Sequence, residues 1–509
     1  MRRTPALVAG IVSLLGCAEA RLACPQRGGA PWLDLSTEHF LVHTDLTAEQ
    51  ARASIATLEQ IHASLHQAAW QGAPAPRVRL EIVLLRSLGE LNQFMPRAVE
   101  GVTWSDQGGK QLIIAQAGQA SALYTVRGGD RILKVNRAVR PDVTLAHEIA
   151  HALNNSFLRR QPLWLAEGLA EYLETVTYDA GSRRSTIGEP PGMLMARFNR
   201  RDRRPKPDIL LADRRVVRTT DEVRAFYADS WALVHWLLNR RPAQFNRFQH
   251  RLRQGDDPDA AWDAEIGVRG AELDDAVAGY LDEILRNGGE YHLFSVEVPI
   301  WDGQVRSAPM SDGEVHALWA RMLRASPAAV PAERIGAEVQ EALRQDPLSP
   351  AVLEVALPEL APDERLDRAR AAVAAHPDDW RAHALLADAL ESLPDRAAAL
   401  EQATARGPQS FELLRALSRV RAAQGRGDEA VELAMRALSL GGVNPVSLIV
   451  LSTGLAVSGN CPEAVRVLRR ALDFADHGAS QEALQQLRER ASLLEQGGCG
   501  TPDSMTSKN

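Results

Sequence analysis

Two histidines four residues apart, with a glutamate directly after the first, are the part of this chain best suited to chemistry. Residues 147–151 read HEIAH, the HExxH pattern, and a Pro-Asp pair shortly before it is a helix start signal. On such a helix His147 and His151 project from one face, about one turn apart, so their ring nitrogens can converge on one zinc ion. Glu148 points about 100° away around the helix axis, where a base for an activated water should be.

A second helix is predicted a short distance along the chain. Residues 162–174 read PLWLAEGLAEYLE, which begins with a helix-compatible proline and places Glu167 and Glu171 on one helical face. Gly168 inside a helix costs about 1 kcal/mol relative to Ala, which indicates that this helix lies very close to another. A helix with an inward carboxylate, packed on the HExxH helix, would supply a third zinc ligand and leave the fourth position for water.

The two segments together resemble the gluzincin metallopeptidases, in particular the peptidase-MA-like group. Its signature is HExxH followed by a helix of the form WLxEGxAxYxE, here WLAEGLAEYLE at 164–174. The resemblance implies that His147, His151 and Glu167 bind Zn²⁺ and that Glu148 is the general base and acid. It also implies that Glu171 orients a ligand histidine. The connection is shorter than in thermolysin-like members, so a shift of one turn, to Glu171 as the ligand, stays open.

Gluzincins usually also present a phenol or an imidazole to the oxyanion of the tetrahedral intermediate. Tyr227, at the start of a YADS segment, is the candidate for this role. Tyr172, Tyr178 and His235 compete with it, and a buried structural tyrosine is the alternative interpretation of Tyr227.

The surrounding pattern predicts an α+β domain. Residues 39–45 alternate as a strand does, residues 47–70 have apolar side chains at helical spacing, and the runs 78–85 and 111–116 are rich in strand-forming residues. From residue 142 onward almost every segment is typical of a helix. With its strands early and its helices late, the first domain, 37–288, is expected to be α+β, and the resemblance to gluzincins implies that it is zincin-like.

An internal period of 34 residues appears in the last third of the chain. It relates Trp380, Leu414 and Leu448, and further sets Leu400/Ala434/Leu468, Ala403/Ala437/Ala471, Gly425/Gly459 and Ala430/Ala464. The segments GRGDEAVELAMRAL and GNCPEAVRVLRRAL resemble tetratricopeptide repeats, which bind proteins in other chains. We therefore expect an all-α tetratricopeptide-like solenoid over 350–497, with about three degenerate repeats and a capping helix. A plain helical bundle is the alternative. Residues 289–349 would connect the two domains, and 498–509 would be a tail.

The start of the chain is typical of an export signal. A basic Met-Arg-Arg precedes an uncharged stretch too short to span a bilayer, and Leu14-Leu15-Gly16-Cys17 resembles a bacterial lipobox. This predicts a signal peptide at 1–16, lipidation of Cys17, a tether at 17–36, and a lipid-anchored protein of the bacterial cell envelope. Ordinary cleavage after residues 18–20 is the alternative. Incorporation of labelled fatty acid, compared with Cys17→Ala, separates the two.

Two of the four cysteines are expected to pair. Cys461 opens one predicted helix and Cys499 follows the next, so antiparallel packing of the two helices would bring them together in a disulfide. Two unpaired thiols are the alternative. Cys24 has no assigned role.

Composition and motifs lead to one functional hypothesis. The 58 basic and 65 acidic residues give a net charge of −7, which provides no global positive field for nucleic acid. We expect an exported zinc-dependent metallopeptidase that hydrolyses peptide bonds through a zinc-activated water with Glu148 as base. The absence of a GxMEN-like segment favours an endopeptidase. The alternative is an inactive zincin-fold scaffold whose repeats bind a protein partner; a purely structural zinc site is disfavoured by its open fourth position.

Overall fold

The computed structural model describes most of the chain between residues 23 and 499. The gaps are at 71–72, 74–77, 96–100, 106–110, 118–119, 129–130, 140, 159–160, 191–203, 213–219, 287–290, 327–329, 408–409, 476–480 and 497–498. The predicted signal peptide and Cys17 lie outside the described residues, as does the tail from residue 500.

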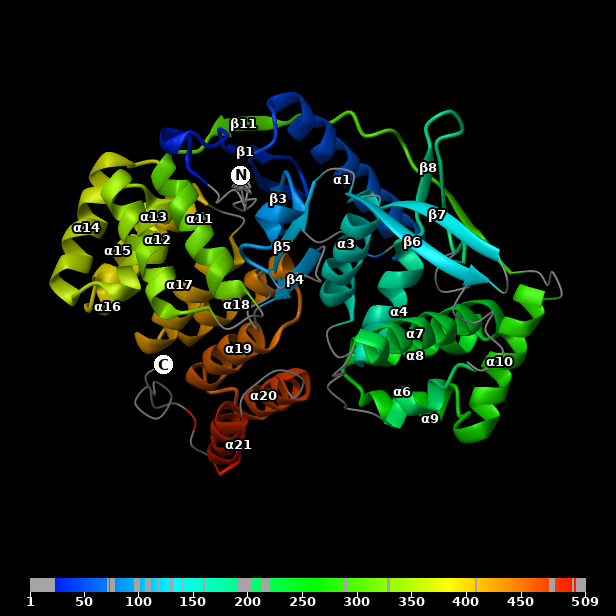
Figure 1. Cartoon of the computed structure of the whole chain (residues 1–509). Helices are drawn as coiled ribbons and strands as arrows, with labels where there is room; N and C mark the ends of the chain where they lie inside the picture. Colours follow the sequence, from blue (N-terminus) through cyan, green and yellow to red (C-terminus); the bar gives the residue numbers. More distant parts are fainter. Residues whose placement is uncertain are drawn as a thin grey trace, which may run out of the picture.

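A six-stranded mixed sheet forms the framework of the N-terminal part (Figure 1). Its order is β11-β1-β2-β3-β5-β4, in which β2, β3 and β5 are parallel and β4 is an antiparallel edge strand. The strands are β1 Leu33–Ser36, β2 Phe40–Thr44, β3 Leu80–Leu85, β4 Gly101–Ser105, β5 Gln111–Gln116 and β11 Arg306–Pro309. A separate ribbon consists of β6 Ala120–Gly128 and β7 Arg131–Val139, and a small sheet of β8 Thr177–Asp179, β9 Arg184–Ile187 and β10 Phe294–Glu297.

Strand β3 is the centre of the hydrophobic core, because all six of its residues are buried. Successive side chains of a strand point to opposite faces of the sheet. Ile82 and Leu84 accordingly belong to a core cluster on one face, whereas Val83 and Leu85 belong to a second cluster on the other. Both faces of the sheet are therefore covered.

Helices of the N-terminal part cover the first face. Helix α1 begins at a capping box formed by Thr47, and its Ile55 packs in one cluster with Ile149 and Trp231 of later helices. The helices are α1 Ala48–Ala69, α3 Pro141–Phe157, α4 Leu163–Leu173, α6 Pro207–Ala212, α7 Thr220–Arg240, α8 Pro242–Gln254, α9 Pro258–Glu265 and α10 Gly270–Arg286. The N-terminal part is thus an α+β unit, as the sequence predicts.

The second face is covered mainly by helix α11 (Asp312–Ala325), with help from the short α2 (Leu88–Leu91). Trp319 of α11 packs edge-on against Trp32, with ring centroids 6.3 Å apart. Arg321 of α11 donates a hydrogen bond to Glu81 of β3 at 2.7 Å, and His43 of β2 contacts the same carboxylate at 3.1 Å. Burial alone would raise the pKa of Glu81, but the Arg321 charge and these hydrogen bonds hold it well below its usual value.

These contacts correct two of the predicted domain limits. Residues 24–36 are not a free tether, because β1 pairs with β2 and β11 and Trp32 is only 1% exposed. The segment 289–349 is not a simple connection, because β11 completes the sheet and α11 covers it. Strand β11 reads RSAP, with no alternation of large apolar side chains, so its sequence carries no strand signal. Strand β1 reads LDLS, which does alternate, but it is only four residues long, the shortest run that can indicate a strand.

The remaining helices form a curved array of antiparallel pairs on one side of the sheet (Figure 1). The array begins at α11 and, within the described residues, comprises five successive pairs and a final helix, rather than about three pairs. The helices after α11 are α12 Ala332–Gln345, α13 Pro350–Ala356, α14 Pro362–Ala375, α15 Trp380–Ala389, α16 Leu393–Arg406, α17 Phe411–Ala423, α18 Gly427–Gly441, α19 Pro445–Val457, α20 Cys461–Ala475 and α21 Gln481–Glu495.

The 34-residue period is visible in the geometry of the last two pairs. Ser418 donates a hydrogen bond to the Ala430 carbonyl at 2.7 Å, and 34 residues later Ser452 donates one to the Ala464 carbonyl at 2.8 Å. The buried alanines let the paired helices approach closely, as in tetratricopeptide-like units.

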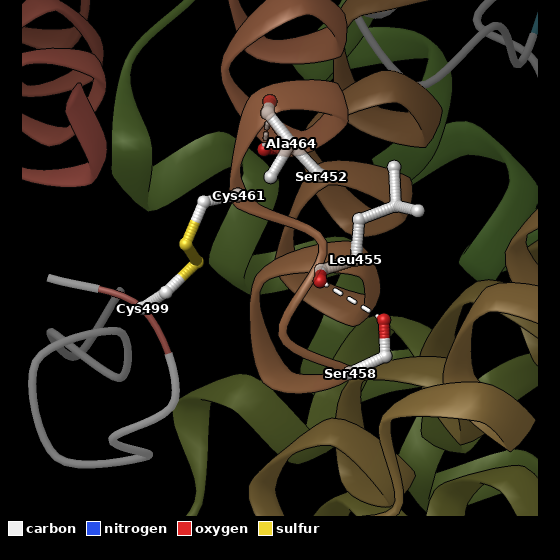
Figure 2. Close-up of a disulfide and its surroundings, with 6 residues drawn as sticks. All are labelled: Ser452, Leu455, Ser458, Cys461, Ala464 and Cys499. Atoms are coloured by element: carbon white, nitrogen blue, oxygen red, sulfur yellow. Dashed lines mark hydrogen bonds between the residues drawn. A yellow bond between two sulfur atoms is a disulfide. The ribbon is translucent and has the colours of Figure 1, made fainter. Parts of the chain in front are cut away.

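Cys461 and Cys499 form a disulfide in the structure (Figure 2), with a Cα to Cα distance of 5.9 Å. Cys461 is the first residue of α20, and Cys499 follows α21, so the bond holds the end of the chain against the last repeat. This is the pairing expected from the sequence. Figure 2 also shows the Ser452 hydrogen bond to Ala464 beside the disulfide.

The array also touches the N-terminal part at points beyond α11. Val78 packs against Phe411 and Leu414 of α17. A Cβ on Gly255, at the end of α8, would lie 3.4 Å from the ring of Phe474 in α20. In the part of the chain that the structure describes, no helix is both long enough and apolar enough to cross a membrane.

Candidate metal centre

The candidate site is built on α3 and α4. Helix α3 begins at Pro141, as predicted, and buries Ile149, Ala150 and Leu153 against the sheet side of the core. Its opposite side presents His147 and His151, both partly exposed. The apolar side of the helix therefore fixes the direction in which the two imidazoles point.

Three side chains converge at this point, as expected from the sequence. The Nε2 atoms of His147 and His151 are 3.0 Å apart, and the Oε2 atom of Glu167 lies 3.6 Å from the first and 3.3 Å from the second. A tetrahedral zinc ion with ligands at about 2.0–2.1 Å would separate its ligand atoms by about 3.3–3.4 Å. The three atoms therefore form a triangle of the size that zinc requires.

The Oε2 atom of Glu167 gives a second test of this fit. It is buried and has no hydrogen-bond partner among the described residues. A buried carboxylate oxygen without a partner is costly, and a cation would satisfy it. Burial would raise the pKa of Glu167, but its contacts with His147 and His151 lower it to about 2, so the group is an anion. The donor set, two imidazoles and one carboxylate, is that of catalytic zinc sites.

A further carboxylate, to which the sequence reasoning assigned no role, holds His147 in place. Glu174 accepts a hydrogen bond from His147 Nδ1 at 2.9 Å, which leaves Nε2 directed at the triangle. Ligand atoms of His147, Glu171 and Glu174 all lie within 4.8 Å of one another. The structure thus assigns the hydrogen bond to Glu174, in the motif quoted above, while the orienting role of Glu171 stays a prediction.

The electrostatics of His147 reflect this crowding by carboxylates. Burial would lower the pKa of His147, but its contact with the Glu167 carboxylate, its hydrogen bond to Glu174 and the charges of Glu174 and Glu148 raise it well above its usual value. The site therefore favours positive charge strongly, in the form of either a proton or a cation.

Glu148, the candidate base, lies beside the triangle and is 7% exposed. The Thr103 hydroxyl of edge strand β4 is 2.7 Å from Glu148 Oε2 and 3.1 Å from the Glu148 main-chain carbonyl. A strand that is remote in sequence therefore reaches the carboxylate. Sequence spacing alone offers no signal for this contact.

Tyr227 is the predicted phenol that the structure places in the electric field of the site. Burial raises the pKa of its phenol, and the charges of Glu167, Glu171 and Glu148 raise it further. The phenol therefore stays protonated and can donate a hydrogen bond.

The three competitors of Tyr227 make contacts of a different kind. His235 binds Tyr280 at 2.6 Å, Tyr178 lies 3.5 Å from the Val298 carbonyl, and Tyr172 stands against Gly188. None of these contacts involves a residue of the triangle.

Gly168 explains how α4 is held. A Cβ at this position would lie 2.5 Å from the Ser230 carbonyl and 2.7 Å from Val234, both on α7. The close approach predicted from this glycine is thus to α7, the helix that also carries Tyr227. Two consecutive residues of α4 therefore place Glu167 toward α3 and the glycine against α7.

Comparisons with known proteins add a family without an assigned activity. Residues 142–255 match the family described as "Protein of unknown function (DUF1570)". The match spans α3, α4 and Tyr227 and covers less than half of the chain. Curated proteins give no match to this sequence.

Two examples among solved structures show some similarity to this chain. One is TTC0263, a thermophilic TPR protein of Thermus thermophilus, with 20% identity, 36% of this chain and 99% of that chain covered, and a TM-score of 0.30. Another is the MamA protein, with 17% identity, 28% and 85% covered, and a TM-score of 0.24. Both TM-scores are low, so the description of the array as tetratricopeptide-like rests on its own helix pairs.

Proposed function

We propose that this protein is a zinc-dependent peptidase of the gluzincin type, with a zincin-like N-terminal domain and a tetratricopeptide-like array. The observation that carries the proposal is the triangle of His147, His151 and Glu167, whose ligand atoms lie 3.0–3.6 Å apart. The open fourth position and the adjacent Glu148 favour a catalytic site over a structural one.

The residues of the site have distinct roles in this proposal. A zinc ion held by the triangle would polarise the scissile carbonyl and make a water molecule more acidic. Glu148 takes a proton from the attacking water and passes it to the leaving nitrogen. Tyr227, whose phenol stays protonated, donates a hydrogen bond to the developing oxyanion. Glu174 keeps His147 in the orientation that directs Nε2 to the ion.

Replacement of the base gives the sharpest test. Glu148→Gln keeps the size of the side chain but cannot accept the water proton, so peptide hydrolysis should fall by at least about 100-fold. Zinc should stay near one ion per chain. The matched control, His147→Ala, should lose both zinc and hydrolysis. The measurements are zinc by elemental analysis and cleavage of casein or a peptide library, with and without a chelator.

The outcomes separate the proposal from its alternative. A wild-type chain that binds one zinc and cleaves no peptide would favour an inactive zincin-fold scaffold. In that case the helix array, which we also propose as a surface for a protein partner, would carry the function. Undiminished hydrolysis by Glu148→Gln would remove Glu148 as the base.

The place where the protein acts is proposed from sequence alone. The basic start, the short apolar stretch and the lipobox-like residues before Cys17 support export and a lipid anchor in the bacterial cell envelope. An exported location is compatible with the Cys461–Cys499 disulfide.

A further inference from the structure

Strand β4 meets helix α3 directly beside Glu148. Gly101 and Thr103 are two residues apart on this strand, so both face the same side of the sheet. A Cβ on Gly101 would lie 2.8 Å from Thr144 and 3.2 Å from Glu148 Cγ, and Thr103 Oγ1 is 2.7 Å from Glu148 Oε2. Two positions of one strand therefore contact the candidate base.

The Thr103 hydroxyl has one proton and two acceptors within reach, namely Oε2 and the main-chain carbonyl of Glu148. The carboxylate is the stronger acceptor, because it is charged, and its distance of 2.7 Å is the shorter one. The helical carbonyl lies farther away, at 3.1 Å. The proton of Thr103 is therefore directed to Oε2.

The second carboxylate oxygen has a different environment. A Cβ on Gly101 would approach Oε1 of Glu148 to 3.4 Å and its Cγ to 3.2 Å. Because glycine has no Cβ, that space beside the carboxylate is free of side-chain atoms from this strand position. Any larger residue at 101 would press on Thr144 and on Glu148 itself.

We propose that Gly101 and Thr103 are positioning residues for the Glu148 carboxylate. Thr103 binds Oε2 and fixes the side-chain conformation, while Gly101 leaves space on the Oε1 side for the water that Glu148 deprotonates. The catalytic consequence rests on the proposed peptidase function. The hydrogen bond itself does not, and it can be tested separately.

The kinetic test compares two substitutions of Thr103. Val has nearly the shape of Thr without the hydroxyl, so Thr103→Val should lower kcat about tenfold or more, since small misplacements of a reacting group are costly. KM should change less than about twofold, and zinc should stay at one per chain. Thr103→Ser keeps the hydroxyl and should retain kcat within about threefold of the wild type.

Gly101→Ala tests the second half of the proposal. The added methyl group must displace Thr144 or Glu148, so kcat should fall with zinc content unchanged. Wild-type kcat in Gly101→Ala would overturn the role of Gly101. Equal kcat values for Thr103→Val and Thr103→Ser would overturn that of Thr103.

A melting experiment tests the hydrogen bond without any activity. Thr103→Val should lower Tm in the wild-type background and should lower it less in a Glu148→Ala background, because the carboxylate is then absent and only the weaker acceptor, the main-chain carbonyl of residue 148, remains. Equal Tm shifts in both backgrounds would overturn the proposal. If the wild type hydrolyses no peptide, the proposed function fails, and this cycle alone decides whether Thr103 holds Glu148.

Discussion

Two carboxylates of the second site segment, Glu171 and Glu174, lie close to His147, with ligand atoms of the three residues within 4.8 Å of one another. The hydrogen bond at 2.9 Å goes to Glu174, so Glu174→Ala should weaken zinc binding by about 10–100-fold, as expected for loss of a group that orients a ligand histidine. Glu171→Ala is the comparison variant and should weaken zinc binding less than Glu174→Ala does, because the 2.9 Å hydrogen bond to His147 comes from Glu174. Competition with a chelating dye measures both. The reverse ranking would return the orienting role to Glu171.

Sequence spacing predicts only part of the candidate site. His147, His151 and Glu167 lie on two helices, and helical periodicity tells which side chains share a face. Thr103 lies on a strand before these helices, and its contact with Glu148 depends on how the sheet packs. Glu174 belongs to the quoted motif. Which of Glu171 and Glu174 accepts the hydrogen bond from His147 depends on side-chain conformation, which periodicity does not determine.

At the scale of elements, the contact between α4 and α7 sets the position of Glu167. Gly168→Ala would place a Cβ 2.5 Å from the Ser230 carbonyl, so the helices must separate. We expect a net loss of about 1–3 kcal/mol in stability, despite the better helix propensity of Ala, and weaker zinc binding. Gly279→Ala in α10 is the control, because, apart from its chain neighbours and the backbone of its own helix, no atom of the described residues lies within 4 Å of a Cβ built there.

The control substitution should leave zinc binding unchanged and raise the stability by about 0.5–1 kcal/mol, since it adds helix propensity without a clash. Urea unfolding with zinc titration measures both variants. Equal stability of Gly168→Ala and Gly279→Ala would show that α4 and α7 can move apart freely.

The helix array shows where a repeat signal ends. The start of α17 at residue 411 and that of α19 at 445 are 34 apart, and the period is readable there. The second helices α16, α18 and α20 start at 393, 427 and 461, which are also 34 apart, so the period includes the α15/α16 pair. Earlier first helices start at 312, 350 and 380, which are 38 and 30 apart. These unequal spacings hide the first two pairs, α11/α12 and α13/α14, from a search at a fixed period.

At the scale of the whole molecule, the array is not an appendage of the α+β part. Its first helix, α11, supplies the second core cluster of the sheet, and Arg321 of that helix neutralises the buried Glu81. The change in composition along the chain suggests two separate domains. In the structure the two parts share a hydrophobic core. Composition does not show which distant segments pack together, so it cannot predict this shared core.

This arrangement predicts how the chain responds to shortening. A fragment of residues 23–310 retains β11 but lacks α11, so it exposes Val83 and Leu85 and leaves Glu81 without Arg321. Loss of one partner of a buried ion pair costs about 3–5 kcal/mol, a large part of the roughly 5–15 kcal/mol that stabilises a typical domain. The fragment should therefore aggregate or melt without a sharp transition.

A longer fragment, residues 23–407, is the matched control. It retains α11–α16 and thus the whole second cluster of the sheet, while it loses the contacts of Val78 with α17 and of Gly255 with Phe474. It should stay soluble and melt cooperatively at a lower Tm than the full chain. Calorimetry and binding of a hydrophobic dye distinguish the two fragments. A sharp calorimetric transition in the shorter fragment would mean that the sheet is stable without its helical cover, because only a packed core unfolds cooperatively.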